Sequence, residues 1–175
     1  MKGILVFFTL FSYSFFVVAQ IDFEEGYFVD NVGKRVDCLI KNIDWRDNPD
    51  RFEYKLENSQ TSQIAILENV QEFGIDNYMK YEKHRVPIDM SSDITSELKG
   101  GNKPVYRDKT VLLKKLVEGK MSLFLYQNGG VKRFLYSKEG SSVTPLVYKR
   151  FIVEGNKVGT NIAFRQQLLS AMTCL

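Results

Sequence analysis

Three aspartates come nearest to a catalytic or metal-binding pattern in this sequence. Asp44, Asp47 and Asp50 recur at every third position around Trp45. Calcium takes several oxygen ligands from a flexible loop, so such a cluster can form a calcium-type site that serves a hydrolase. The EF-hand pattern is different, because its ligands recur at every second position with a glycine at the sixth. Aspartate also favours turns, so the cluster is interpreted as turn chemistry, with metal binding as the alternative.

The single histidine and the two cysteines limit the other kinds of chemistry. His84 lies in a run of charged residues, and the sequence shows no carboxylate that would orient it as a general base, so we interpret it as a solvated strand residue. One histidine and two distant cysteines are too few for a zinc site. A disulfide bond between Cys38 and Cys174 would close a very long loop in an oxidising compartment. Two unpaired thiols are the alternative.

The sequence contains no pattern typical of a nucleotide-binding or a nucleic-acid-binding protein. The phosphate-binding motif G-x-x-x-x-G-K-[ST] does not occur, so we expect no nucleotide, no cofactor and no enzymatic activity. Basic pairs such as Lys132-Arg133 and Lys149-Arg150 lie beside aromatic residues. Neighbouring strand residues point to opposite faces, so each pair is split, and we interpret these residues as solvated or edge-protecting charges. The sequence therefore predicts no nucleic-acid partner.

The elements that would position these residues are mostly β-strands. Apolar residues that alternate with polar ones, bounded by turn residues, predict strands at 26–29, 34–40, 51–56, 63–67, 70–75 and 78–88. Segment 91–109 is poor in apolar residues and contains the run GGNKP at 100–104. It predicts a mobile loop or a subdomain boundary in loop 89–108.

The C-terminal part has the clearest pattern. Short turns separate four strand-length runs at 110–118, 121–127, 131–137 and 146–153. Connections this short make neighbouring strands antiparallel, so we predict a four-stranded meander. A final stripe at helical spacing predicts a helix: Phe164, Leu168, Ala171 and Leu175. The expected fold class is mostly β (α+β), with antiparallel sheets that include this C-terminal meander and with one C-terminal helix.

The first 19 residues have the pattern of a secretory signal. Fourteen of them are apolar, Lys2 is the only charged one, and Val17-Val18-Ala19 places small residues before Gln20. This pattern is typical of a cleaved signal peptide; a retained membrane anchor is the alternative. Without residues 1–19 the net charge is about +2, too small to predict an anionic partner. We predict a signal peptide at 1–19, a single β-rich domain at 20–175, no transmembrane segment in the mature chain, and a secreted, periplasmic or cell-surface location.

Five phrases of the sequence carry a resemblance. They are FEEGYF at 23–28, CLIKNIDW at 38–45, VEGK at 117–120, LVYKR at 146–150 and QQL at 166–168. Together they resemble an uncharacterised secreted envelope protein family of Bacteroidota, in which some members continue into an outer-membrane β-barrel. The resemblance implies an envelope protein and brings no catalytic signature. This chain stops at Leu175, which leaves open whether it is a truncated form of a longer envelope protein.

Composition, motifs and resemblance lead to one expected function and one alternative. We expect an exported, non-enzymatic binding module that contacts an envelope protein or a glycan through its sheet face or through loop 89–108. The alternative is a metal-dependent hydrolase that uses the aspartates near Trp45.

Overall fold

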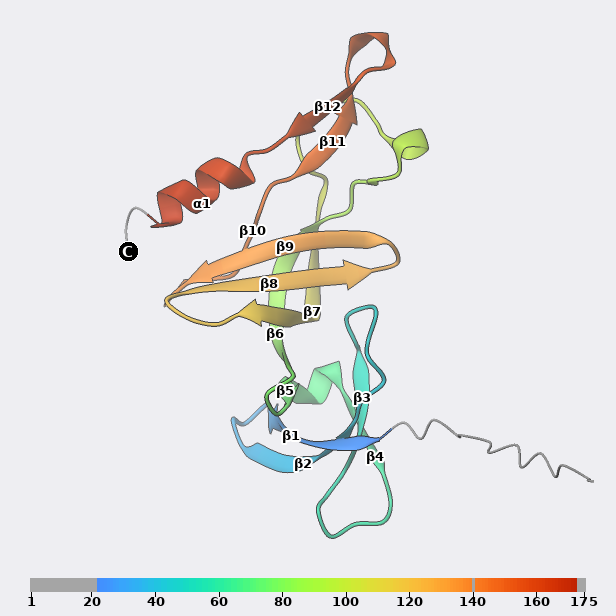
Figure 1. Cartoon of the computed structure of the whole chain (residues 1–175), viewed down its shortest axis with the longest axis vertical. Helices are drawn as coiled ribbons and strands as arrows, with labels where there is room; N and C mark the ends of the chain where they lie inside the picture. Colours follow the sequence, from blue (N-terminus) through green and yellow to red (C-terminus); the bar gives the residue numbers. More distant parts are fainter. Residues whose placement is uncertain (1–21, 140, 173–175) are drawn as a thin grey trace, which may run out of the picture.

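The computed structural model describes residues 22–139 and 141–172. The predicted signal peptide and Cys174 lie outside these residues. The described chain forms a ten-stranded sheet in the order β10-β9-β8-β7-β6-β5-β1-β2-β3-β4, a separate two-stranded sheet and one α-helix (Figure 1). The strand pairs within both sheets are antiparallel. The predicted fold class, mostly β with antiparallel sheets and a C-terminal helix, is confirmed.

The N-terminal half supplies five strands, which lie at the bottom of Figure 1. They are β1 (Phe23–Asp30), β2 (Arg35–Lys41), β3 (Arg51–Lys55), β4 (Gln63–Ile66) and β5 (Val70–Ile75), with a 3₁₀ turn, η1 (Leu67–Asn69), before β5. The first hairpin turn is closed by the Asp30 carboxylate, whose Oδ1 accepts the backbone N–H groups of Val32 and Lys34, both at 2.9 Å.

The C-terminal half contains the predicted meander. The strands of this half in the main sheet are β6 (Met79–Asp89), β7 (Tyr106–Val117), β8 (Met121–Asn128), β9 (Val131–Lys138) and the short β10 (Thr144–Pro145). The turn between β8 and β9 has Gly129 and Gly130 at φ of 55° and 85°, the positive values that favour glycine. Three of the four predicted meander strands are confirmed as β7, β8 and β9, and β10 takes the place of the fourth.

The fourth strand of the meander is shorter and earlier than expected. We predicted a strand at 146–153, but the ladder with β9 consists of Thr144 and Pro145. Proline has no N–H to donate, which suits an edge strand and limits its length. The chain then leaves the main sheet, and β11 (Lys149–Ile152) pairs instead with β12 (Val158–Asn161), which sequence analysis did not predict. A 3₁₀ turn, η3 (Glu154–Asn156), connects the two.

Two hydrophobic clusters form on opposite faces of the sheet. Phe73, Tyr81 and Leu112 belong to the N-terminal cluster, whereas Val86 and Leu113 belong to the C-terminal one. Leu112 and Leu113 are adjacent on β7, and adjacent strand residues point to opposite faces. The core therefore changes face within β6 and β7. The predicted loop 89–108 overlaps the ends of both strands: residues 90–105, which contain η2 (Thr95–Glu97), connect β6 and β7 after an unbroken ladder from Lys80–Lys115 to Asp89–Tyr106.

The helix α1 (Phe164–Met172) has no buried residue. Its Phe164 and Leu168 line an apolar groove of about 500 Å³ together with Leu123 and Phe134 of the meander. No helix in the described ranges has the length and apolar character needed to cross a membrane.

Candidate functional site

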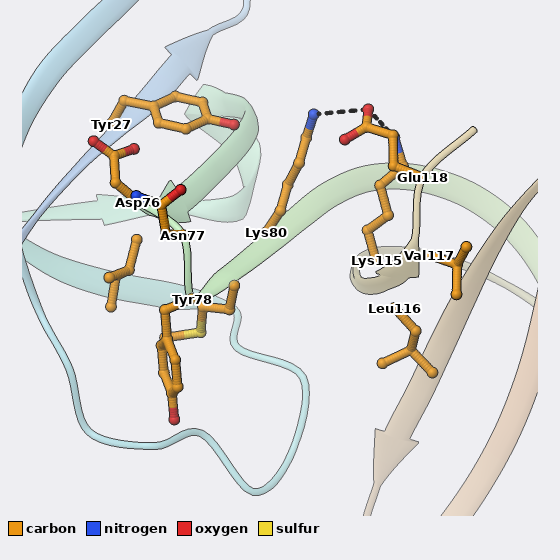
Figure 2. Close-up of a pocket in the computed structure, with 11 residues that line it drawn as sticks. Tyr27, Asp76, Asn77, Tyr78, Lys80, Lys115, Leu116, Val117 and Glu118 are labelled. Carbon is orange, nitrogen blue, oxygen red and sulfur yellow. Dashed lines mark hydrogen bonds and ion pairs between the residues drawn. The ribbon is translucent and has the colours of Figure 1, made fainter.

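A cleft of about 290 Å³ opens where the turn between β5 and β6 faces the C-terminal end of β7 (Figure 2). Tyr27, Asp76 and Asn77 lie on one side, Lys80 lies in the middle, and Leu116 to Glu118 lie on the other side. The cleft thus joins segments that are far apart in the sequence.

Two local irregularities shape this cleft. The turn between β5 and β6 is closed by a hydrogen bond of 3.1 Å from Tyr78 N to Ile75 O, and Asn77 takes a positive φ of 57°. On the opposite side, the register of β7 against β8 shifts between Lys115 and Val117, which is a β-bulge. A bulge bends a strand and redirects its side chains. Both irregularities occur where the regular ladder ends, so polar groups can converge there.

A charged network lines the sheet face behind the cleft. Glu82 on β6 lies 2.7 Å from the Lys115 ammonium and 3.4 Å from that of Lys80. Glu118 lies 2.8 Å from Lys115 and 3.4 Å from Lys80, the contacts dashed in Figure 2. Each of these four groups therefore contacts both groups of opposite sign. The alternating charges hold Lys80 and Lys115 in fixed positions.

Tyr27 extends the network onto β1. Its hydroxyl donates to Glu72 Oε1 at 2.5 Å, and Glu72 Oε2 lies 3.3 Å from the Lys80 ammonium. Burial, together with the neighbouring Glu72 carboxylate, raises the pKa of Tyr27 to about 12. Burial alone would lower the pKa of Lys80, but Glu72, Tyr27 and Glu82 outweigh it and raise that pKa. Tyr27 and Lys80 therefore keep their protons at neutral pH.

Glu82 is the carboxylate most strongly perturbed by this network. Its burial would raise its pKa, but hydrogen bonds from His84 and Lys115 and the charges of Lys115 and Lys80 lower the pKa to about 2. A carboxyl group that titrates this low in the folded chain stays ionised across the ordinary pH range.

This pKa predicts an acid-dependent loss of stability. On folding, the pKa of Glu82 falls from its ordinary value of 4.5 to about 2. Such a carboxyl group stabilises the folded state at pH values above the pKa that it has in the unfolded chain. That stabilisation, about 2–3 kcal/mol, should be lost as the pH falls from about 5 towards 2. Urea unfolding followed by Trp45 fluorescence should show the loss in the native chain and a smaller loss in Glu82→Gln. The exposed Glu57→Gln is the control. Equal losses in native and Glu82→Gln chains would contradict the prediction.

The structure gives the three predicted aspartates separate partners. Asp44 Oδ1 accepts the Tyr78 hydroxyl at 3.4 Å, Asp47 Oδ2 accepts Gly129 N at 3.4 Å, and Asp50 pairs with Arg51 at 3.1 Å. Across residues 22–139 and 141–172, no group of three or more histidine, cysteine, aspartate or glutamate side chains is placed to hold a metal ion. Asp44 is thus the member of this cluster that touches the cleft, through Tyr78.

Asn48 fixes this aspartate segment. Its side-chain amide donates to Leu112 O at 2.5 Å and to Leu125 O at 3.2 Å, while its Oδ1 accepts the backbone N–H of Gln127. Asn48 therefore holds the 44–50 segment against the edge where β7 and β8 separate.

His84 and Cys38 have different surroundings. The His84 ring lies 3.3 Å from Glu82 and packs edge-on against Phe124 at 5.2 Å, so it belongs to the charged network rather than to open solvent. Cys38 is buried in the N-terminal cluster and forms no disulfide bond with another described residue. Burial raises its pKa to about 11. Cys174 lies outside the described residues, so its pairing with Cys38 stays a prediction.

Sequence analysis overlooked most of the charged network. The only available signal was the alternation of Lys80, Glu82 and His84, which places three polar side chains on one face of β6. Their partners on β1, β5 and β7 depend on the strand order and register, which that alternation does not contain.

The interpretation of the basic pairs as solvated charges is wrong for one member of each pair. We expected solvated charges, but Arg133 and Lys149 are each 6% exposed, while their neighbours Lys132 and Arg150 are exposed and half-buried. As the predicted split between faces requires, one side chain of each pair points inward. There it donates a hydrogen bond to a backbone carbonyl of loop 89–108: Arg133 to Asp89 O and Lys149 to Lys103 O.

The fold and the cleft define an antiparallel β protein with a partly polar cleft at irregular strand ends in the middle of its main sheet. Comparisons of the chain with protein-family profiles, curated proteins and solved structures return no match. The function therefore has to be inferred from the geometry of the site.

Proposed function

We propose that this protein is an exported cell-envelope protein that binds a glycan in the cleft and does not transform it. The observation that carries the proposal is a turn with an exposed aromatic ring and two exposed polar side chains, which lies across the cleft from a fixed ammonium group. Tyr78 is 56% exposed, and the exposed Asp76 and Asn77 precede it in the same turn. Lys80 and Glu118 face this turn across the cleft.

These groups match the chemistry of a sugar. A sugar ring offers an apolar face of C–H groups, which packs on an aromatic ring, and hydroxyl groups, which pair with carboxylates, amides and ammonium groups. Leu116 and Val117, 42% and 52% exposed, add apolar surface at the opposite side. Such a combination of apolar contact with a few placed polar groups is typical of binding sites for small ligands.

The pairing of the charges supports binding rather than catalysis. A general acid or base must be able to exchange a proton near the working pH. Glu82 titrates at about 2 and Tyr27 at about 12, and both are engaged by neighbours in the network. These groups are suited to holding Lys80 in place.

Export is supported by the signal pattern of residues 1–19. When cells are fractionated, the protein should be found outside the cytoplasm. N-terminal sequencing of this protein should begin at Gln20. Recovery from the cytoplasm with Met1 or Lys2 at its start would overturn this part of the proposal.

The glycan site can be tested on the same preparation. An array of envelope oligosaccharides should show selective binding, and Tyr78→Ala should weaken the affinity for the selected sugar about tenfold or more. Tyr106→Ala removes another exposed tyrosine, which does not line the cleft, and should leave the affinity unchanged.

Three outcomes would overturn the glycan proposal. They are an array without a selective ligand, equal affinities for the native and Tyr78→Ala chains, and cleavage of the bound sugar. Calcium-dependent cleavage that is lost in Asp44→Asn would support the metal-dependent hydrolase instead.

A further inference from the structure

A second pocket, of about 550 Å³, lies between loop 89–108 and β11. Four basic side chains line it, from both sides: Lys99, Arg107, Lys149 and Arg150. Glu97 is the one acidic residue that lines it, and its Oε2 accepts the Ser92 hydroxyl at 2.7 Å. The lining therefore carries a clear excess of positive charge.

Lys149 is the most informative of these residues. It is 6% exposed, and its ammonium group donates to one neutral acceptor, Lys103 O, at 2.6 Å. Among the described residues, no carboxylate lies within ion-pair distance of it. Burying a cation without an anion is costly, so buried ammonium groups are ordinarily paired. An anion in the pocket would supply the missing partner.

Arg150 is held beside it by neutral groups as well. Its Nη1 donates to Asp93 O at 2.9 Å and its Nη2 to Thr95 Oγ1 at 3.2 Å. The Asp93 carboxylate pairs instead with Arg133, which also contacts Asp89. The two aspartates nearest this part of the loop are therefore engaged elsewhere, and neither neutralises the pocket.

Hydrogen bonds to backbone carbonyl groups of the loop tie the two sides of the pocket together. Ile152 N donates to Lys99 O at 3.1 Å, and Asn161 Nδ2 donates to Asn102 O at 2.9 Å. Gly100 and Ile152 form an isolated parallel bridge. These contacts fix loop 89–108 against β11 and β12, which lie beside it in Figure 1. The cations are thus positioned before any ligand arrives.

We propose that this pocket binds the phosphate group of a small phosphate monoester. A phosphate dianion accepts hydrogen bonds from several directions, which suits two guanidinium groups beside two ammonium groups. The pocket volume falls in the range of small-molecule sites, and it exceeds what a phosphate group alone fills. This site is separate from the glycan cleft, so either proposal can fail without the other.

Titration calorimetry with three soluble probes tests the proposal. Glucose 6-phosphate should bind, inorganic phosphate should bind more weakly, and glucose should give no heat. Lys149→Met should weaken binding of glucose 6-phosphate by about tenfold or more. The same variant should keep the melting temperature or raise it by about 2–4 °C, because it removes a buried charge that lacks a counter-ion. Arg107→Gln, at an exposed position in the lining, should also weaken binding.

Lys120→Met is the matched control. It removes the same charge from an exposed turn residue outside the pocket and should leave the affinity unchanged. Equal weakening by Lys120→Met and Lys149→Met would mean a response to overall charge and would overturn the site. So would binding to phosphatidic acid vesicles without binding to the soluble ester, or a fall in melting temperature in Lys149→Met with unchanged affinity.

Discussion

Replacing Arg133 by methionine is expected to lower the free energy of unfolding by about 3–5 kcal/mol. The Arg133 side chain is 6% exposed and lies at the base of loop 89–108. Its Nε donates to Asp89 O at 2.9 Å and lies 3.5 Å from Asp89 Oδ2. Its two terminal nitrogens donate to the Asp93 carboxylate and to Ser91 O. One guanidinium group thus satisfies three residues of the loop.

The expected loss is large because of what the substitution leaves behind. Asp89 is 5% exposed, and its Oδ2 accepts no hydrogen bond from the described part of the chain, so Arg133 is its source of positive charge there. Its Oδ1 accepts Ser91 N, the Ser91 hydroxyl and Val105 N at 2.7 to 3.0 Å, and thereby closes the loop. Without Arg133 a buried carboxylate remains unpaired, and that residual charge costs more than the original pair contributed.

Urea unfolding at neutral pH measures this loss. Arg85→Met is the matched control, because Arg85 lies on β6 with a side chain that is 78% exposed and 3.8 Å from Asp108. An exposed pair of this kind contributes less than about 1 kcal/mol. The double variant Asp89→Asn/Arg133→Met should be more stable than Arg133→Met, since it removes the unpaired charge. Equal effects of Arg133→Met and Arg85→Met would show that the buried pair does not stabilise the loop.

Local patterns were sufficient for the fold class but not for the connections between distant strands. The hairpins and the helix follow from residues close in sequence, such as Asn128-Gly129-Gly130 and the Phe164–Leu168 stripe. The pairing of β11 with β12 could not be predicted in this way. It depends on Pro145 ending the ladder with β9 and on contacts with loop 89–108 more than forty residues away.

The sites were less accessible to sequence analysis than the fold. Loop 89–108 lines the basic pocket, and its expected part in binding stays a prediction. The burial of Lys149 was not expected, because the pattern of a basic pair beside aromatic residues fits solvent-exposed side chains as well as buried ones. Which member of such a pair points inward depends on the register of its strand, and one residue of shift reverses the faces.

Gly26→Ala is expected to destabilise the fold by about 3 kcal/mol, through a contact that no sequence pattern reveals. Gly26 on β1 pairs with Ile75 on β5. A Cβ atom at Gly26 would lie 2.3 Å from the carbonyl oxygen of Gly74 and 3.2 Å from Ile75 Cα. Both contacts are with backbone atoms, so no side-chain rotation relieves them. β1 and β5 would have to move apart along the ladder that joins the N-terminal strands to β6.

Urea unfolding separates this clash from a general effect of replacing glycine. Gly119→Ala is the control, because a Cβ atom there would have Met121 O as its nearest neighbour at 3.8 Å, an ordinary contact, and we expect a change within about 0.5 kcal/mol. Since β1 also carries Tyr27, displacement of the strand should disturb the hydroxyl contact with Glu72 and so the wall of the cleft. A Gly26→Ala chain as stable as the native one would contradict the close approach of β1 and β5. A destabilised chain with weakened glycan binding would show that the cleft depends on the close approach of Gly26 to Gly74.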